Sequence, residues 1–226
     1  MVGKIKYILV IIVLMMSANV AIAQFGLSGG VSMLKGFGVP KPYIGMHIGG
    51  EIPRDDQITL YARLSLYASQ TSTIKNVTSV YAIDPSTNPY SKNIGVYDKM
   101  NFTVIEGGTR YYIGNGYDSG FGAYGGSNVL LAFNSVKRNY DDYDQTKYEL
   151  PINELPKGSI FNLGFGLGGG IKNTFPGIGT LYFDLNLAYL VLPMANNETA
   201  ANAANYSNLY SQLLFSFNLG FRKEFY

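Results

Sequence analysis

Residues 213–225 read LLFSFNLGFRKEF, and this stretch decides the fold. Small, polar or charged side chains such as Ser216, Asn218 and Arg222 fall between regularly spaced large apolar ones. A period of two puts alternate side chains on opposite faces of an extended strand. The stretch therefore predicts a β-strand with one apolar and one polar face, whose apolar positions are Leu213, Phe215, Phe217, Leu219 and Phe221.

The same alternation recurs along the chain in segments of about 10 to 16 residues, the length of a tilted strand that crosses a bilayer. Residues 58–66, for example, read ITLYARLSL. No stretch after the first 23 residues shows sustained helical periodicity. We predict eight strands, at 25–34, 43–52, 58–69, 100–113, 121–133, 160–172, 181–192 and 209–225.

The connections between these segments alternate in length. Residues 53–57, 114–120 and 173–179 are short and rich in turn-forming residues. The connections at 70–99, 134–159 and 193–208 are much longer, and only the first, around 35–41, breaks the pattern. Alternation of short turns with long loops is typical of barrels whose short turns face the periplasm. An even number of strands then places both termini in the periplasm.

The first 23 residues have the pattern of a secretory signal peptide. Lys4 and Lys6 precede the apolar stretch 7–16, and Ala21-Ile22-Ala23 forms a small-residue cleavage site. The apolar core of about ten residues is shorter than the ~20 that a membrane-spanning helix needs. We therefore expect 1–23 to be a cleaved leader and 24–226 to be the mature domain.

The composition favours a lipid-facing surface. Charged residues make up 14% of the chain, against ~25% in an ordinary soluble domain. Removing Lys4 and Lys6 from the 17 basic residues leaves 15, equal to the 15 acidic ones, so a basic footprint for nucleic acid is missing. The chain has no Cys, which excludes a lipoprotein anchor, disulfides and thiolate metal sites.

Strands in hydrocarbon must close into a ring, because each unpaired backbone group there costs several kcal/mol. We therefore predict an all-β fold: an eight-stranded, antiparallel, up-and-down transmembrane β-barrel in a bacterial outer membrane. The chain resembles the OmpA/OmpX-like superfamily of small outer-membrane barrels over the whole mature region. Its richness in Tyr, Asn and Gly resembles barrels from Bacteroidota.

The last strand resembles the C-terminal signal that the barrel-assembly machinery reads. The resemblance implies that this machinery inserts the chain. The family usually ends on an outward-facing aromatic residue; Phe225 has that parity here, and Tyr226 adds one residue. The residues of this assembly signal are Phe217, Leu219, Phe221, Phe225 and Tyr226.

Parity along the strands also predicts which charged side chains face the lumen. An eight-stranded barrel is just wide enough for side chains to fill, and buried charges must be paired. We expect a structural network of ion pairs, with a gated ion path as the alternative. Its members are His47, Glu51, Arg63, Glu106, Arg110, Lys172, Asp184, Arg222 and Glu224.

His47 is the single histidine, and some eight-stranded barrels are enzymes that modify lipid A with a His. A nucleophile and its base need an oriented partner, and no G-x-S-x-G signature accompanies His47. A satisfied interior histidine is the favoured interpretation. We expect no catalytic residue, no metal and no cofactor.

The long loops are the favoured place for function, because loops carry binding residues on a rigid scaffold. The segment 136–148 mixes tyrosines with charges, and its carboxylates suit Ca²⁺ as an alternative to a solvated acidic turn. The segment 195–206, with Asn and Ala repeats, is predicted to be a flexible tip. The candidate contact residues are Tyr140, Asp141, Asp142, Tyr143 and Asp144.

We therefore expect a non-enzymatic outer-membrane protein that acts as a scaffold, as an adhesin or as part of a secretion or motility assembly. Its expected partners are outer-membrane lipid and lipopolysaccharide, the assembly machinery, and proteins of an envelope complex. A lipid-modifying enzyme of the outer leaflet and a narrow channel are the alternatives.

Overall fold

The computed structural model describes residues 24–151 and 156–225, so the predicted leader and Tyr226 lie outside the described residues. The described chain contains ten strands and one helix. Eight strands form the barrel wall: β1 (Phe25–Gly36), β2 (Tyr43–Pro53), β3 (Ile58–Thr71), β5 (Ser91–Gly114), β6 (Gly120–Tyr140), β8 (Lys157–Phe175), β9 (Gly179–Ala195) and β10 (Leu213–Phe225).

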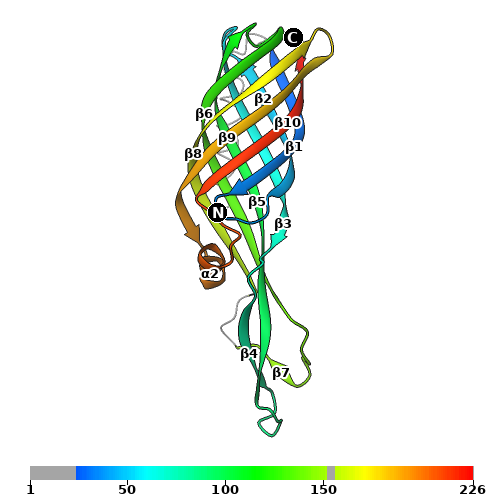
Figure 1. The fold of residues 1–226 in the computed structure, drawn as a ribbon, viewed down its shortest axis with the longest axis vertical. Coiled ribbons are helices and arrows are strands. Elements are labelled where there is room, and N and C mark those ends of the chain that lie inside the picture. The colour runs from blue at the N-terminus through cyan, green and yellow to red at the C-terminus, as the bar shows by residue number, and fades with distance from the viewer. Residues whose placement is uncertain (1–23, 152–155, 226) are drawn as a thin grey trace, which may run out of the picture.

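These eight strands close into a ring, as the sequence predicts (Figure 1). Every neighbouring pair is antiparallel, and β3 pairs with β5. The ring closes where β1 pairs with β10, from Phe25 opposite Phe225 to Gly36 opposite Leu214. Closure gives each wall strand a partner on both sides, which removes the open edges that hydrocarbon does not tolerate.

Both described ends of the chain lie at one end of the barrel, together with the short turns. The long connections lie at the other end. Since short turns of outer-membrane barrels face the periplasm, we call the end with the long connections extracellular.

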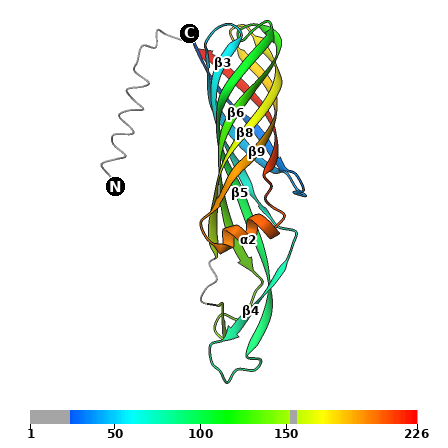
Figure 2. The ribbon, with the colours of Figure 1, turned by 90° about the vertical axis from the view of Figure 1, so that its left-hand side faces the viewer.

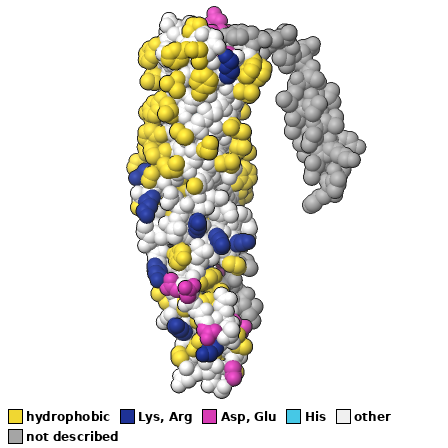
Figure 3. Space-filling model, turned by 90° about the vertical axis from the view of Figure 1, so that its right-hand side faces the viewer, with side chains coloured by type: hydrophobic (Ala, Val, Ile, Leu, Met, Phe, Trp, Pro, Cys, Tyr) yellow, Lys and Arg dark blue, Asp and Glu magenta, His cyan; other side chains and the backbone are white. Residues whose placement is uncertain are grey.

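The outer wall is apolar over much of its height. Every wall strand exposes large apolar side chains, and Met46 and Leu167 are 70% and 68% exposed. A continuous apolar surface of this kind indicates contact with lipid or protein. Figure 3 shows hydrophobic side chains over the upper barrel, a few charged side chains at its upper rim, and most of the visible Lys, Arg, Asp and Glu in the lower half. This order matches a wall that lies in lipid, with charge on the extracellular side.

Two strands are much longer than a bilayer requires. β5 has 24 residues and β6 has 21, and both continue past the barrel on the extracellular side (Figure 2). There β5 pairs with β4 (Asn76–Ala82), and β4 pairs with β7 (Tyr148–Glu149). We call this sheet the protrusion. Residues 70–99 and 136–148 were predicted as loops, and that prediction was wrong where β4, β5, β6 and β7 run through them.

The protrusion has a small core of its own, separate from the barrel interior. Val80, Ala82, Ile94 and Tyr148 are buried in it, and Tyr140, Tyr143 and Leu150 pack against them. A sheet that buries apolar side chains is held in one shape more firmly than an open loop.

The segment 195–206 is also structured, which corrects the prediction of a flexible tip. Helix α2 (Glu198–Tyr206) begins at Asn197, whose side chain accepts a hydrogen bond from the Ala200 amide. Ala200 and Ala203 are fully buried against the extracellular end of the barrel interior. Because small side chains allow close packing, these alanines let the helix dock against β6, β8 and β9. Within residues 24–151 and 156–225, no helix is long and apolar enough to cross a membrane.

Candidate functional site

The periplasmic half of the lumen contains a buried layer of charged and polar side chains. All nine residues that parity assigns to the interior lie here or at its edge, and none is more than 9% exposed. The layer has four cations and four carboxylates, and His47 is the ninth member. We call this set, with its tyrosine and threonine partners, the polar layer.

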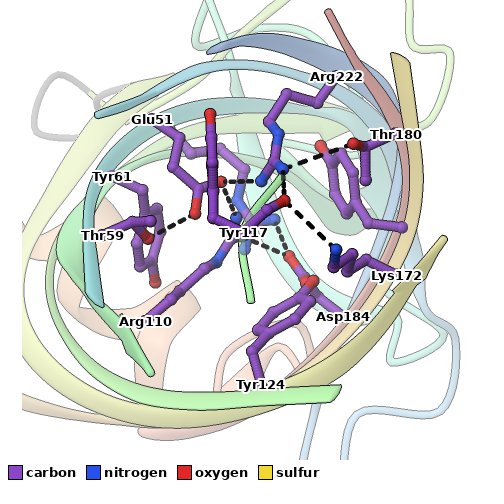
Figure 4. A network of polar contacts seen from close by, with 12 residues as sticks. Glu51, Thr59, Tyr61, Arg110, Tyr117, Tyr124, Lys172, Thr180, Asp184 and Arg222 are labelled. Carbon is purple, nitrogen blue, oxygen red and sulfur yellow. Dashed lines mark hydrogen bonds and ion pairs between the residues drawn. The ribbon is translucent and has the colours of Figure 1, made fainter. Parts of the chain in front are cut away.

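Glu51 is the centre of the polar layer (Figure 4). Its Oε2 accepts from Arg110 Nη1 at 2.7 Å and from Arg222 Nη1 at 2.9 Å. Its Oε1 accepts from Thr59 at 2.5 Å and from Tyr112 at 2.6 Å. Four donors on one buried carboxylate meet the requirement that a charge away from water be paired.

Asp184 forms the second centre. Its Oδ2 accepts from Arg63 Nη1 at 2.6 Å and from Arg110 Nη2 at 2.9 Å, and its Oδ1 accepts from the Tyr124 hydroxyl. Arg63 also forms an ion pair with Glu106. Arg110 therefore links the two carboxylate centres.

Aromatic rings pack over the guanidinium groups. Arg110 lies 4.3 Å from the Tyr61 ring centroid and 4.9 Å from that of Tyr124. Such cation–π contacts stabilise a cation where water is excluded.

Tyr117, from the turn between β5 and β6, closes the periplasmic end. Gly116, with φ of +67°, turns the chain so that Tyr117 enters the lumen, where it is 1% exposed. Its ring lies 3.8 Å from the Arg222 guanidinium, and its carbonyl accepts from Arg222 Nη2. The sequence alone does not reveal the role of Tyr117, because parity assigns no facing to a residue in a turn.

Lys172 is the one cation of the layer that forms no ion pair among the described residues. Its Nζ donates to the carbonyls of Tyr117 at 3.3 Å and Ser119 at 2.7 Å. It also lies 3.3 Å from Thr174 Oγ1. The ammonium group therefore holds the 115–119 turn against the barrel end.

Glu224 lies beside Arg222 near the same end. Its Oε1 accepts from Arg222 Nε at 2.9 Å and from Thr180 at 2.6 Å. Thr180 shares a further hydrogen bond with Thr174. Short polar side chains thus complete the layer around the charged ones.

His47 has a partner on each ring nitrogen. Ser32 Oγ lies 2.7 Å from Nδ1, and the Tyr182 hydroxyl lies 2.6 Å from Nε2. Since Ser32 donates its one hydrogen to Asn218 Oδ1 at 2.6 Å, it accepts from Nδ1–H, which leaves Nε2 to accept from Tyr182. His47 is therefore a neutral, satisfied histidine that is 2% exposed.

The extracellular half of the lumen is mostly apolar, which parity of charged residues did not reveal. Tyr43 packs edge-on against Phe102 at 4.8 Å, and helix α2 packs against β6, β8 and β9. Asn134 and Asn162 are buried here and share a hydrogen bond. The core of this layer includes Leu34, Tyr43, Tyr67, Met100, Phe102, Val104, Leu130, Val136, Ile160, Leu190 and Leu214.

Two small cavities lie among the described side chains of the interior. One beside Arg110 and Asp184 has a volume of about 10 Å³. Another, between Glu106 and Leu214 where the two layers meet, has about 20 Å³. A water molecule needs ~10–15 Å³, so each has room for about one water and neither is part of a wide pore.

The predicted contact residues of the 136–148 segment are spread through the protrusion. Asp141 pairs with Lys75 at 2.7 Å, and Lys75 holds the pKa of that carboxyl below its ordinary value. Asp144 accepts from Thr146, while Asp142 is exposed. Tyr140 and Tyr143 pack on the small core. Among the described residues, no three metal-ligating side chains converge on one point.

The predicted assembly-signal residues of β10 lie on the outer wall. Phe217, Leu219, Phe221 and Phe225 are 37% to 48% exposed, and Phe225 stacks on Phe25 at 5.1 Å. Their recognition by the assembly machinery stays a prediction.

Comparison with known proteins identifies the fold. No protein-family model and no curated protein sequence matches the chain. A major outer membrane protein from Thermus thermophilus aligns with a TM-score of 0.52 and 14% identity, over 90% of this chain and 99% of that one. Neisserial surface protein A aligns with a TM-score of 0.50 and 11% identity, over 89% of this chain and 96% of that one.

At such low identity these matches show the fold alone. The fold is that of small outer-membrane β-barrels, and the closed wall with its apolar outer face is what a bilayer requires. The chain is therefore an outer-membrane β-barrel protein in contact with outer-membrane lipid. The resemblance to Bacteroidota barrels stays a prediction.

Proposed function

We propose that this chain is a non-enzymatic interaction protein that holds the protrusion outside the cell for contact with another molecule. The observation that carries the proposal is the exposed apolar face of the protrusion. Val77 is 68% exposed, Ile83 53% and Tyr90 56%. These side chains lie on strands and turns that extend past the barrel, where lipid does not cover them.

The small buried core of the protrusion supports this role, because it holds the exposed face in place. The face opposite the small core presents Val77 and Tyr81 on β4, and Tyr81 lies 6.2 Å from Tyr90, ring to ring. Tyrosine is enriched in protein contact surfaces because it offers a large, stiff area at low entropic cost. Such a surface suits an adhesin or a component of an envelope assembly.

The interior argues against the two alternatives. A narrow channel needs a water path, whereas the interior cavities described above have room for about one water each. A lipid-modifying enzyme needs a base that substrate can reach, but His47 is buried and both its nitrogens are occupied.

A pull-down of the full chain from native membranes in mild detergent, repeated with extracellular medium, tests the proposal. We expect a stoichiometric partner that binds the wild type and is lost in the triple variant Val77→Asn, Tyr81→Ser, Tyr90→Ser. The matched control is Ser86→Ala with Thr87→Ala at the tip of the same hairpin. If binding of the partner is instead lost with Ile178→Ser in a periplasmic turn, or if no protrusion variant changes that binding, the proposal is wrong.

A further inference from the structure

Three lysines lie side by side across the outer wall at its extracellular edge. Lys99 on β5 is directly opposite Lys137 on β6, and Lys137 is directly opposite Lys157 on β8. All three side chains are exposed and have outward parity. We call them the lysine row. Like charges directly opposite one another destabilise a sheet, so this arrangement calls for a counter-charge.

The described part of the chain does not supply that counter-charge. Among residues 24–151 and 156–225, no ion pair joins Lys99, Lys137 or Lys157 to a carboxylate, whereas nearby Lys75 and Arg138 are paired with Asp141 and Asp98. Adjacent strands lie ~4.8 Å apart, so the three ammonium groups fall within reach of one or two phosphate groups.

The position of the row relative to the membrane indicates where the anion comes from. Phe133 and Phe161 lie opposite each other on the same wall, with ring centroids 5.1 Å apart. Two residues closer to the extracellular end lie Ser135 and Ser159, and the lysine row lies two residues beyond them. Apolar, aromatic, small polar and cationic side chains therefore follow one another toward the extracellular end.

The spacing between the aromatic pair and the lysine row gives the approximate depth of the row in the membrane. Lys137 is four residues beyond Phe133, or ~13 Å along a strand, which a tilt of ~45° reduces to ~10 Å along the membrane normal. Aromatic girdles lie at the edge of the hydrocarbon, and the polar headgroup layer begins there. The lysine row is thus at the depth of phosphates on outer-leaflet lipids.

From this register, this depth and the absence of a counter-charge among residues 24–151 and 156–225, we infer that the lysine row is a binding site for the phosphorylated headgroup of an outer-leaflet glycolipid. Each ammonium group donates to phosphate oxygens, while Phe133, Phe161 and the apolar wall contact the acyl chains of the same lipid. The site is independent of the proposed contact face on the protrusion, which lies farther from the membrane.

Binding to full-length protein in phospholipid nanodiscs tests the inference, with bis-phosphorylated lipid A and its dephosphorylated form as probes. Since a lysine near a charged lipid surface contributes ~1 kcal/mol, Lys137→Gln with Lys157→Gln is expected to weaken binding of phosphorylated lipid A roughly 10- to 30-fold. The dephosphorylated form is expected to bind the wild type and this variant equally weakly.

The matched control, Lys92→Gln with Lys147→Gln, removes the same charge from the protrusion and is expected to change affinity less than about twofold. Heat-modifiable electrophoretic mobility checks that each variant folds. The inference is overturned if phosphorylated lipid A binds no better than its dephosphorylated form, or if both double variants lose the same affinity. It is also overturned if inorganic phosphate or a sulfated oligosaccharide binds the row as tightly as lipid A, because the site would then serve soluble anions.

Discussion

Arg222 and Glu51 are 171 residues apart in the chain, yet Arg222 Nη1 lies 2.9 Å from Glu51 Oε2 across the lumen. Each is 2% exposed. The contact joins the last strand of the barrel to the second, on either side of β1, so it ties ring closure to the polar layer.

Replacing Glu51 tests the energetic weight of this layer. Glu51→Ala leaves Arg110 and Arg222 each with one carboxylate fewer in a dry interior. We expect a loss of about 3 kcal/mol or more in the free energy of unfolding, as is usual when one partner of a buried ion pair is removed. Urea titration of the protein in lipid vesicles measures this quantity.

The control for that experiment is Asp142→Asn, which changes an exposed carboxyl and is expected to shift the same free energy by less than about 0.5 kcal/mol. A Glu51 variant as stable as this control would mean that the polar layer does not stabilise the barrel.

The closely packed side chains of the lumen predict that the protein does not conduct ions. Because interior cavities with room for about one water provide no wide aqueous path, planar bilayers with the purified protein are expected to show no discrete conductance steps. Reproducible steps in the wild type, absent from a mock preparation, would revive the channel hypothesis.

Helix α2 is expected to detach without loss of the barrel when its buried face is made charged. Ala203→Asp places a carboxylate in the apolar layer, where an unpaired charge is strongly disfavoured. We expect faster proteolysis within 196–212 and unchanged heat-modifiable mobility of the barrel. Asn202→Asp, on the exposed side of the helix, serves as the control. Equal protection of 196–212 from proteolysis in both variants would show that α2 is not docked on the barrel end.

The Lys75–Asp141 pair makes a prediction about pH. The hydrogen bond from Lys75 keeps the pKa of Asp141 below its ordinary value. A carboxyl with a lowered folded pKa stabilises the fold at neutral pH, and this contribution is lost as the pH falls through the folded value. We expect Lys75→Gln to raise the pKa of Asp141 in a carboxyl NMR titration, whereas Lys147→Gln leaves it in place. An unmoved pKa in the Lys75 variant would show that the pair does not form in solution.

The sequence predicts the wall well because a barrel imposes a period of two on every strand. The side chains of Glu51, Arg110 and Arg222 were assigned to the interior by counting alone, since a one-residue shift would have put charge into lipid. The sequence did not reveal their partners, because residue facing says nothing about which side chains meet across the lumen.

The remaining features escaped prediction for physical reasons. Tyr117 enters the lumen from a turn, where no periodicity applies. Beyond the bilayer nothing enforces apolar alternation, so the protrusion strands, with buried Ile94 and Val96 spaced among polar residues, resemble a loop. Helix α2 is short and rich in Asn and Ala, and docking on the barrel end stabilises it more than its own propensity does.

The most direct test of the account is the topology of the chain in intact cells. The protein has no native Cys, so single-cysteine variants can be labelled without background. Ser86→Cys, at the tip of the protrusion, is expected to react with a membrane-impermeant maleimide on whole cells. Ile178→Cys, at a position 64% exposed in a short turn, is expected to react only after the outer membrane is permeabilised. The reverse pattern, or equal labelling of both sites in intact cells, would contradict a barrel that spans the outer membrane with its protrusion outside.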